Sequence, residues 1–152
     1  MFFYRIEDKS GNGIYRSKNV DGLDLSIGIL AAKLCSNCWH HTPPDIDFWE
    51  DFPLMGEKPN TDYKFAFKNL HQLYRWFDTV ESIGLFDKLG FQISKYEIDQ
   101  KHVKISDSQM IYLSGKEKFI EKIPFSLDNL DRKCNYENLK KEQLKLVYQL
   151  GI

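Results

Sequence analysis

A single arginine lies inside the first apolar run of the chain, Phe2-Phe3-Tyr4-Arg5-Ile6. Arginine keeps its positive charge in proteins, so its guanidinium needs a carboxylate, a phosphate or water beside it. Two interpretations follow from this position. Either the run is an edge strand and Arg5 points into solvent, or Arg5 faces a cleft that binds an anionic ligand. The second interpretation predicts a ligand-binding protein or an enzyme.

A second group of reactive side chains comprises Cys35, Cys38, His40 and His41. Two thiols and two imidazoles are ligand types that zinc takes in structural sites. Such sites usually take their second ligand pair from a separate segment, and Cys134 is the only other cysteine in the chain. The alternative is two small core cysteines beside a polar loop. We favour that alternative and assign no metal site.

His41 also precedes two prolines and the carboxylates of Asp45 and Asp47. The prolines restrict the backbone of this segment and hold it extended. Because imidazole titrates near neutral pH, a histidine in such a loop can act as a general acid or base. The alternative is that loops collect His, Pro and Asp by composition alone. His41 is thus one candidate catalytic residue.

Gln109 is the other candidate, because it begins the apolar run Gln109-Met110-Ile111-Tyr112-Leu113. A polar side chain at a strand start can project into a cleft, and an amide that both donates and accepts suits ribose hydroxyls. The alternative is a strand-start residue that meets water. The sequence has no Walker loop, no G-x-G-x-x-G after a strand and no G-x-S-x-G, so P-loop hydrolysis, Rossmann redox chemistry and serine hydrolysis are not indicated.

The composition excludes several classes of protein. The 152 residues suit one domain with a proper core, and an aromatic content of 14% is too high for a disordered chain. With 21 basic and 22 acidic residues the charge is -1, which does not favour nucleic acid as a partner. We find no membrane span and no signal peptide, and three cysteines fit a reducing compartment. A cytoplasmic location is expected.

The elements that must position these residues follow from periodicity and from turn residues. We expect strands at residues 2–7, 63–67, 91–98, 103–105 and 109–113, and helices at 23–34, 70–77, 80–89 and within the charged tail 127–150. Residues 35–59 read as a long irregular segment. Asn69 is expected to cap the second helix and Gly90 to end the third.

This mixture predicts the α+β class, with a small mixed or antiparallel sheet and packed helices. We expect a core over residues 1–126 and a C-terminal helical extension of the same domain over 127–152. The basic-aromatic run Tyr74-Arg75-Trp76-Phe77 has the composition of a nucleic-acid contact. Its helical spacing with Leu70 and Leu73 instead favours a core face, with Arg75 outside.

Several segments together resemble a family of small phage and prophage proteins. The shared pattern is Tyr-Arg-Ile-Glu at residues 4–7, Gly-x-Gly-x-Tyr at 11–15, His-x-Pro with acidic residues at 41–47, an aromatic-leucine segment at 65–77, Gly-Phe-x-Ile at 90–93 and a late Gln strand at 109–112. The resemblance covers residues 2 to 113. It implies a phage-encoded protein that acts in the host cytoplasm.

The order of these segments is also similar to the minimal ADP-ribosyltransferase layout. This likeness implies that Arg5 on the first strand holds NAD, that Tyr15 and Phe65 form an aromatic wall, and that Gln109 contacts the ribose, with His41 lining the same cleft. Active transferases usually carry Glu at the late-strand position. Gln supplies no negative charge to stabilise the positive charge that develops at the ribose, so NAD binding is implied more strongly than catalysis.

Two main functions are therefore expected. The first is an NAD-binding, ADP-ribosyltransferase-like phage protein that, if it is a mono-ADP-ribosyltransferase, modifies a host protein or nucleic acid. The second is a non-enzymatic inhibitor that binds a host defence complex directly, an anti-CRISPR or similar, through residues 45–51 and the charged tail. Phe48, Trp49 and Phe52 would then be anchors. A zinc-stabilised binding module is a weaker third alternative.

Overall fold

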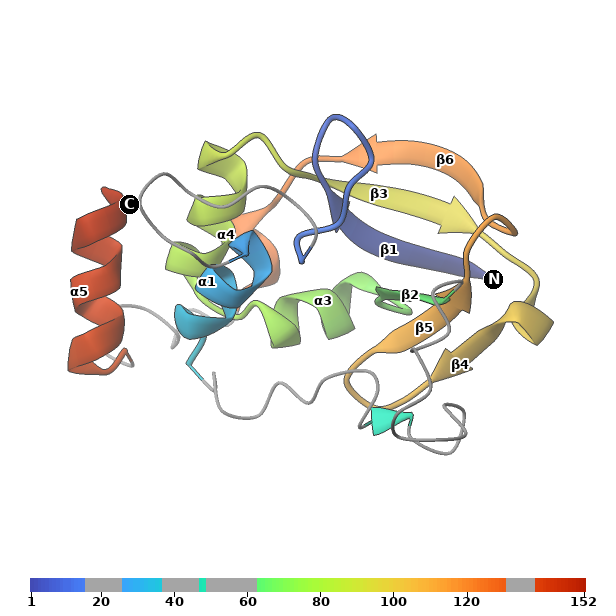
Figure 1. Cartoon of the computed structure of the whole chain (residues 1–152), viewed down its shortest axis with the longest axis horizontal. Helices are drawn as coiled ribbons and strands as arrows, with labels where there is room; N and C mark the ends of the chain where they lie inside the picture. Colours follow the sequence, from blue (N-terminus) through green and yellow to red (C-terminus); the bar gives the residue numbers. More distant parts are fainter. Residues whose placement is uncertain (16–25, 37–46, 49–62, 131–138) are drawn as a thin grey trace.

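The structure is a computed structural model that describes residues 1–15, 26–36, 47–48, 63–130 and 139–152. Its strands form two antiparallel three-stranded sheets, shown in Figure 1. In the first sheet the order is β1 (Phe2–Glu7), β3 (Gln92–Glu97) and β6 (Lys118–Ile123). In the second the order is β2 (Tyr63–Ala66), β5 (Met110–Leu113) and β4 (Val103–Ile105). The α+β class is thereby confirmed, with two small antiparallel sheets where one sheet was expected.

Four α-helices lie in the described part of the chain: α1 (Ile27–Lys33), α3 (Leu70–Trp76), α4 (Val80–Lys88) and α5 (Lys141–Leu150). Short 3-10 turns occupy Gln100–His102 and Leu127–Asn129. The side chain of Asn69 accepts from the Gln72 backbone N–H and begins α3 as expected, and Thr79 begins α4. Gly90, with φ of 80°, follows the end of α4. No helix in these ranges is long and apolar enough to cross a membrane.

The side chains pack into two clusters. The larger one joins Ile6 and Ile93 of the first sheet to the helices, and it includes Leu30 of α1, Phe86 of α4 and Val147 of α5. Figure 1 shows α1, α3 and α4 beside one another, with α5 at the far end of the molecule from the second sheet. The smaller cluster lies where the two sheets meet, and it comprises Phe3, Ala66, Ile98, Met110 and Tyr112.

The elements differ from the expected ones at three places. Strand β6 was not predicted, because five of its six residues are exposed and its charges hide any alternation of apolar residues. Helix α1 is shorter than 23–34, since Ser26 accepts from the Ile29 backbone N–H and begins it there. In the described part of the tail, where one helical extension was expected, α5 covers Lys141–Leu150 and a 3-10 turn covers Leu127–Asn129.

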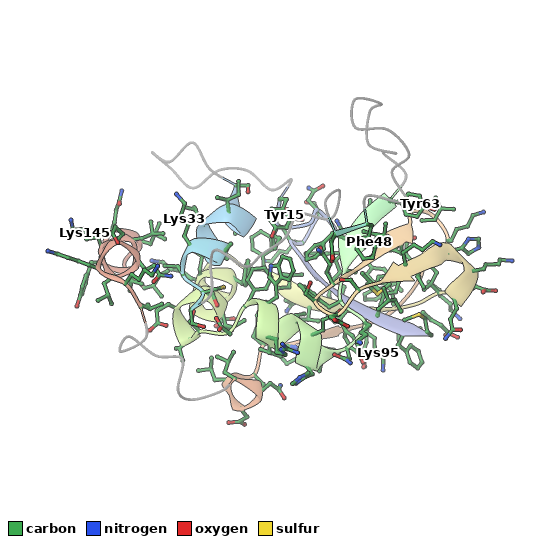
Figure 2. All side chains as sticks on the ribbon, turned by 90° about the horizontal axis from the view of Figure 1, so that it is seen from below. Tyr15, Lys33, Phe48, Tyr63, Lys95 and Lys145 are labelled. Carbon is green, nitrogen blue, oxygen red and sulfur yellow. The ribbon has the colours of Figure 1, made fainter. Side chains whose placement is uncertain are left out.

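The segment Tyr74-Arg75-Trp76-Phe77 belongs to the core, as its helical spacing indicated. Tyr74, Trp76 and Phe77 are buried and Arg75 is exposed. Phe48, an anchor residue in the protein-binding hypothesis, is also buried with 6% of its surface accessible. Its side chain is labelled in Figure 2. Trp49 and Phe52 lie outside the described residues. A buried Phe48 cannot act as an exposed anchor.

Candidate functional site

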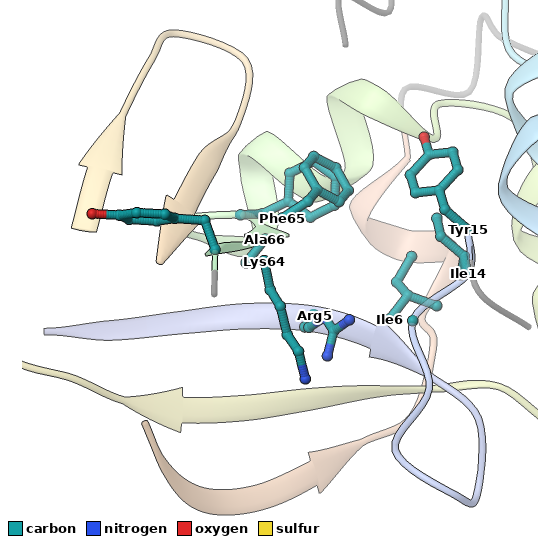
Figure 3. Close-up of a pocket in the computed structure, with 10 residues that line it drawn as sticks. Arg5, Ile6, Ile14, Tyr15, Lys64, Phe65 and Ala66 are labelled. Atoms are coloured by element: carbon teal, nitrogen blue, oxygen red, sulfur yellow. The ribbon is translucent and has the colours of Figure 1, made fainter. Parts of the chain in front are cut away.

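A cavity of about 120 Å³ opens between β1, the segment Gly13-Ile14-Tyr15 and β2. Its lining includes Arg5, Tyr15 and Phe65, which are the three residues expected to bind the cofactor. Figure 3 shows them around one space, with Arg5 on β1, Phe65 on β2 and Tyr15 on the segment that returns from the first turn. Residues 50 positions apart in the chain, Tyr15 and Phe65, thus share one site.

The cavity exists because β1 has two different neighbours along one edge. Tyr4 exchanges two backbone hydrogen bonds with Phe67, at 2.8 and 2.9 Å, which joins β1 to the end of β2. Three residues further on, Glu7 instead forms a bridge with Gly13. The chain from Gly13 to Tyr15 therefore lies where β2 would otherwise continue alongside β1. The two strands diverge from this fork, and the cavity lies between them.

Arg5 does not point freely into solvent, because a carboxylate lies beside it. Its Nη1 donates to Oε2 of Glu7 at 2.8 Å, and the two side chains are 11% and 2% exposed. Oε1 of Glu7 accepts from the Tyr96 hydroxyl at 2.6 Å. Burial, and then the bond to Glu7, raise the pKa of Tyr96. The Arg5 charge is thus compensated inside the protein.

Aromatic rings form the wall of the cavity on the helix side. The rings of Tyr15 and Phe65 meet edge to face with centroids 5.8 Å apart, and the ring centroids of Phe65 and Trp76 are 5.4 Å apart. Tyr15 is 41% exposed and sits over Gly28, where a Cβ atom would come within 2.6 Å of the tyrosine ring. Because Tyr15 and Phe65 already touch, they are adjoining walls and not two faces of a sandwich.

Sequence reasoning missed Lys64, a further cation in the lining of the cavity. Lys64 is half-buried, and it forms no ion pair with any of the described residues. Alternation along Tyr63-Lys64-Phe65 puts Lys64 on the face opposite Phe65, so the local sequence did not indicate that both residues line one cavity. Since Glu7 offsets the charge of Arg5, the charge of Lys64 gives the cavity a net positive charge among the described residues.

Gln109 is not brought to this cavity. It lies immediately before β5, is fully buried, and donates from Nε2 to Oδ2 of Asp47 at 2.9 Å. The same carboxylate oxygen accepts from the Ser106 hydroxyl. The amide is therefore part of a buried network at the β4–β5 turn. His41 lies outside the described residues.

Of the four possible zinc ligands, only Cys35 is described, and it is fully buried. Its thiol donates to the carbonyl of Ala31 at 3.2 Å. The described ranges contain no group of three His, Cys, Asp or Glu residues that could hold a metal ion. Cys38, His40 and His41 fall in the undescribed segment, so the zinc alternative stays a hypothesis.

Comparison with known protein families places the chain in a family of bacteriophage proteins, as the shared segments implied. The chain belongs to the Bacteriophage T4 Y00F protein family, whose model matches residues 1–126. No curated protein and no solved structure matches the chain. The family match thus extends the resemblance beyond residue 113, and it says nothing about ADP-ribosyltransferases.

Proposed function

We propose that the protein binds NAD, with one end of the dinucleotide in the cavity between β1 and β2. The observation that carries this proposal is the convergence of Tyr15 and Phe65 on one cavity, although they come from two separate segments, together with the positively charged Lys64 in the same lining. A flat ring lying against the Tyr15 and Phe65 rings would gain apolar burial and ring contacts. The positive charge of Lys64 would favour the phosphates.

The backbone of Phe65 supports a pose in which the nicotinamide end of NAD enters the cavity. Phe67 bonds to Tyr4, so its N–H and C=O point toward β1. Along a strand, the N–H and C=O groups of successive residues point to alternate edges. The backbone N–H and C=O of Phe65 therefore point to the same edge as those of Phe67, toward the cavity between β1 and β2. A carboxamide can accept from the N–H and donate to the C=O of one residue. Phe65 offers this donor and acceptor side by side.

The size of the cavity limits the proposal. Ligand pockets usually hold about 300–1,000 Å³, whereas this one holds about 120 Å³. Only a ring-sized part of NAD would be enclosed, and the remainder would lie along the surface. The proposal is therefore one of binding. Transfer of ADP-ribose to a host protein or nucleic acid would need Gln109 or His41 at the ribose, and Gln109 lies outside the cavity lining.

Calorimetric titration with NAD tests the proposal. We expect saturable binding, and Tyr15→Ala should weaken it about tenfold or more, since one wall of the site is removed. Tyr148→Ala is the matched control, because Tyr148 is 77% exposed on α5 and does not line the cavity. Nicotinic acid adenine dinucleotide, which replaces the carboxamide by a carboxylate, should bind more weakly than NAD. Absence of heat with NAD would overturn the proposal.

A second candidate function is the direct binding of a host protein. The observation that favours it is strand β6, which exposes 50% of Phe119 and 37% of Ile120 at the edge of the first sheet. Exposed edge strands with apolar side chains are common contact sites. On this alternative, Phe119→Ser with Ile120→Ser should abolish a stoichiometric complex with a host defence protein. NAD binding should be unchanged in the same variant.

A further inference from the structure

The likeness to transferases assigns the anion-holding role to Arg5, but the structure assigns it elsewhere. Nη1 of Arg5 is engaged by Glu7 at 2.8 Å, and Glu7 is 2% exposed. Nη2 lies so close to Gly13 that a Cβ atom there would come within 2.4 Å. Tyr112 lies beside the same guanidinium. Burial raises the pKa of the Tyr112 phenol, and the positive charge of Arg5 lowers it by a smaller amount. Arg5 is thus held on three sides.

Lys64 is in the opposite situation. Its side chain lines the same cavity, and the described residues give it no carboxylate partner. Figure 3 shows it reaching from β2 toward β1, where Arg5 lies. Two cations at one cavity with a single buried carboxylate leave an excess of positive charge there. A half-buried ammonium without a counter-charge is stabilised when an anion joins it.

Resting on the proposed function, we infer that Lys64 is the residue that binds the diphosphate of the ligand, and that Arg5 instead fixes the turn at Gly13 through its ion pair with Glu7. The ligand class is a diphosphate ester whose ring occupies the cavity. Lysine suits this role because its ammonium binds phosphate as a mobile point charge.

The test is titration of NAD and of inorganic pyrophosphate into the full chain and three variants. Lys64→Ala should weaken both ligands about tenfold, and Lys64→Arg should restore most of the affinity. The dependence of affinity on salt should fall in Lys64→Ala. Lys116→Ala is the control of equal charge, since Lys116 is exposed and does not line the cavity.

The structural role of Arg5 is tested by the double variant Arg5→Met with Glu7→Gln. This variant removes both charges of the ion pair and keeps a side-chain oxygen that can accept from the Tyr96 hydroxyl. It should keep wild-type affinity for pyrophosphate, with an unchanged near-UV circular dichroism spectrum. Loss of pyrophosphate binding in this folded variant, or unchanged binding in Lys64→Ala, would overturn the inference. If NAD does not bind but pyrophosphate binds in a Lys64-dependent manner, the NAD proposal fails and the anion site stands. If neither ligand binds, both fail.

Discussion

Gly13 lies directly against the guanidinium of Arg5, so that a Cβ atom added to Gly13 would meet Nη2 at 2.4 Å. The end of an arginine side chain can usually move aside, but this one is held by Glu7. We expect Gly13→Ala to lower the free energy of unfolding by about 1–3 kcal/mol, the usual cost of overpacking. Urea denaturation measures it. An unchanged midpoint would show that the ion pair yields without cost.

Removal of Arg5 alone should damage folding more than removal of both charges. Arg5→Ala leaves the buried carboxylate of Glu7 without its cation, which typically costs about 3–5 kcal/mol. The double variant Arg5→Met with Glu7→Gln keeps the volume and removes the uncompensated charge, so it should lose less than half as much. Denaturation of the two variants side by side gives the comparison. Equal losses would contradict the assignment of Arg5 to a structural ion pair.

Thr79 connects two helices through one hydroxyl. It donates to the carbonyl of Leu34 after α1 at 2.6 Å and accepts from the Ser82 backbone N–H at 3.0 Å in α4. Thr79→Ala should lower the free energy of unfolding by about 2 kcal/mol. Thr79→Ser keeps the hydroxyl and should restore most of that loss. Thermal unfolding followed by circular dichroism distinguishes the cap from a simple loss of packing.

Glu81 predicts a dependence of stability on pH. It is 2% exposed in the first turn of α4, and Oε2 has no hydrogen-bond partner among the described residues. Burial raises the pKa of Glu81 above its usual value of 4.5. A raised pKa in the folded state gives stability that is complete below the unfolded pKa and is lost as pH rises through the folded pKa. Relative to wild type, Glu81→Gln should therefore gain stability as pH rises above 4.5, the usual pKa of this carboxyl group. Parallel pH profiles would refute this.

Gly84 offers a stabilising substitution. It lies within α4, and an added Cβ atom would be 3.3 Å from Cγ2 of Ile152, a side chain that can shift. Replacement of a helix-interior glycine by alanine reduces the entropy of the unfolded chain. Gly84→Ala should raise the free energy of unfolding by about 0.5–1 kcal/mol. A decrease would mean that Ile152 is packed too firmly to move.

The sequence predicted local elements well where side chains of one segment decide them. Asn69 caps α3 because its own side chain reaches Gln72, and β4 has the expected bounds Val103–Ile105. Strand β6 escaped prediction because its stability comes from pairing with β3 and not from its own pattern. In the described tail, α5 begins only after Lys140, and the sequence carried no start signal there because lysine is not a usual N-cap residue.

The site was only partly accessible to sequence reasoning. Arg5 and Glu7 are two residues apart on one strand, so alternation places both side chains on the same face, and the ion pair could have been predicted from it. The pairing of Tyr15 with Phe65 was predicted from the likeness to transferases. The local sequence could not predict it, because it depends on the divergence of β1 and β2. Nothing in the local sequence of Gln109 indicates that Asp47 will hold its amide.

The bridge between Tyr4 and Phe67 has a consequence for the dynamics of the molecule. In the described ranges, two backbone hydrogen bonds join the two sheets beside the cavity, and both the small Phe3 cluster and the larger core cluster pack across the same junction. These two bonds close the backbone junction between β1 and β2 at one end of the cavity. The hydrogen-exchange rates of the Tyr4 and Phe67 amide protons therefore measure how often this junction between β1 and β2 opens.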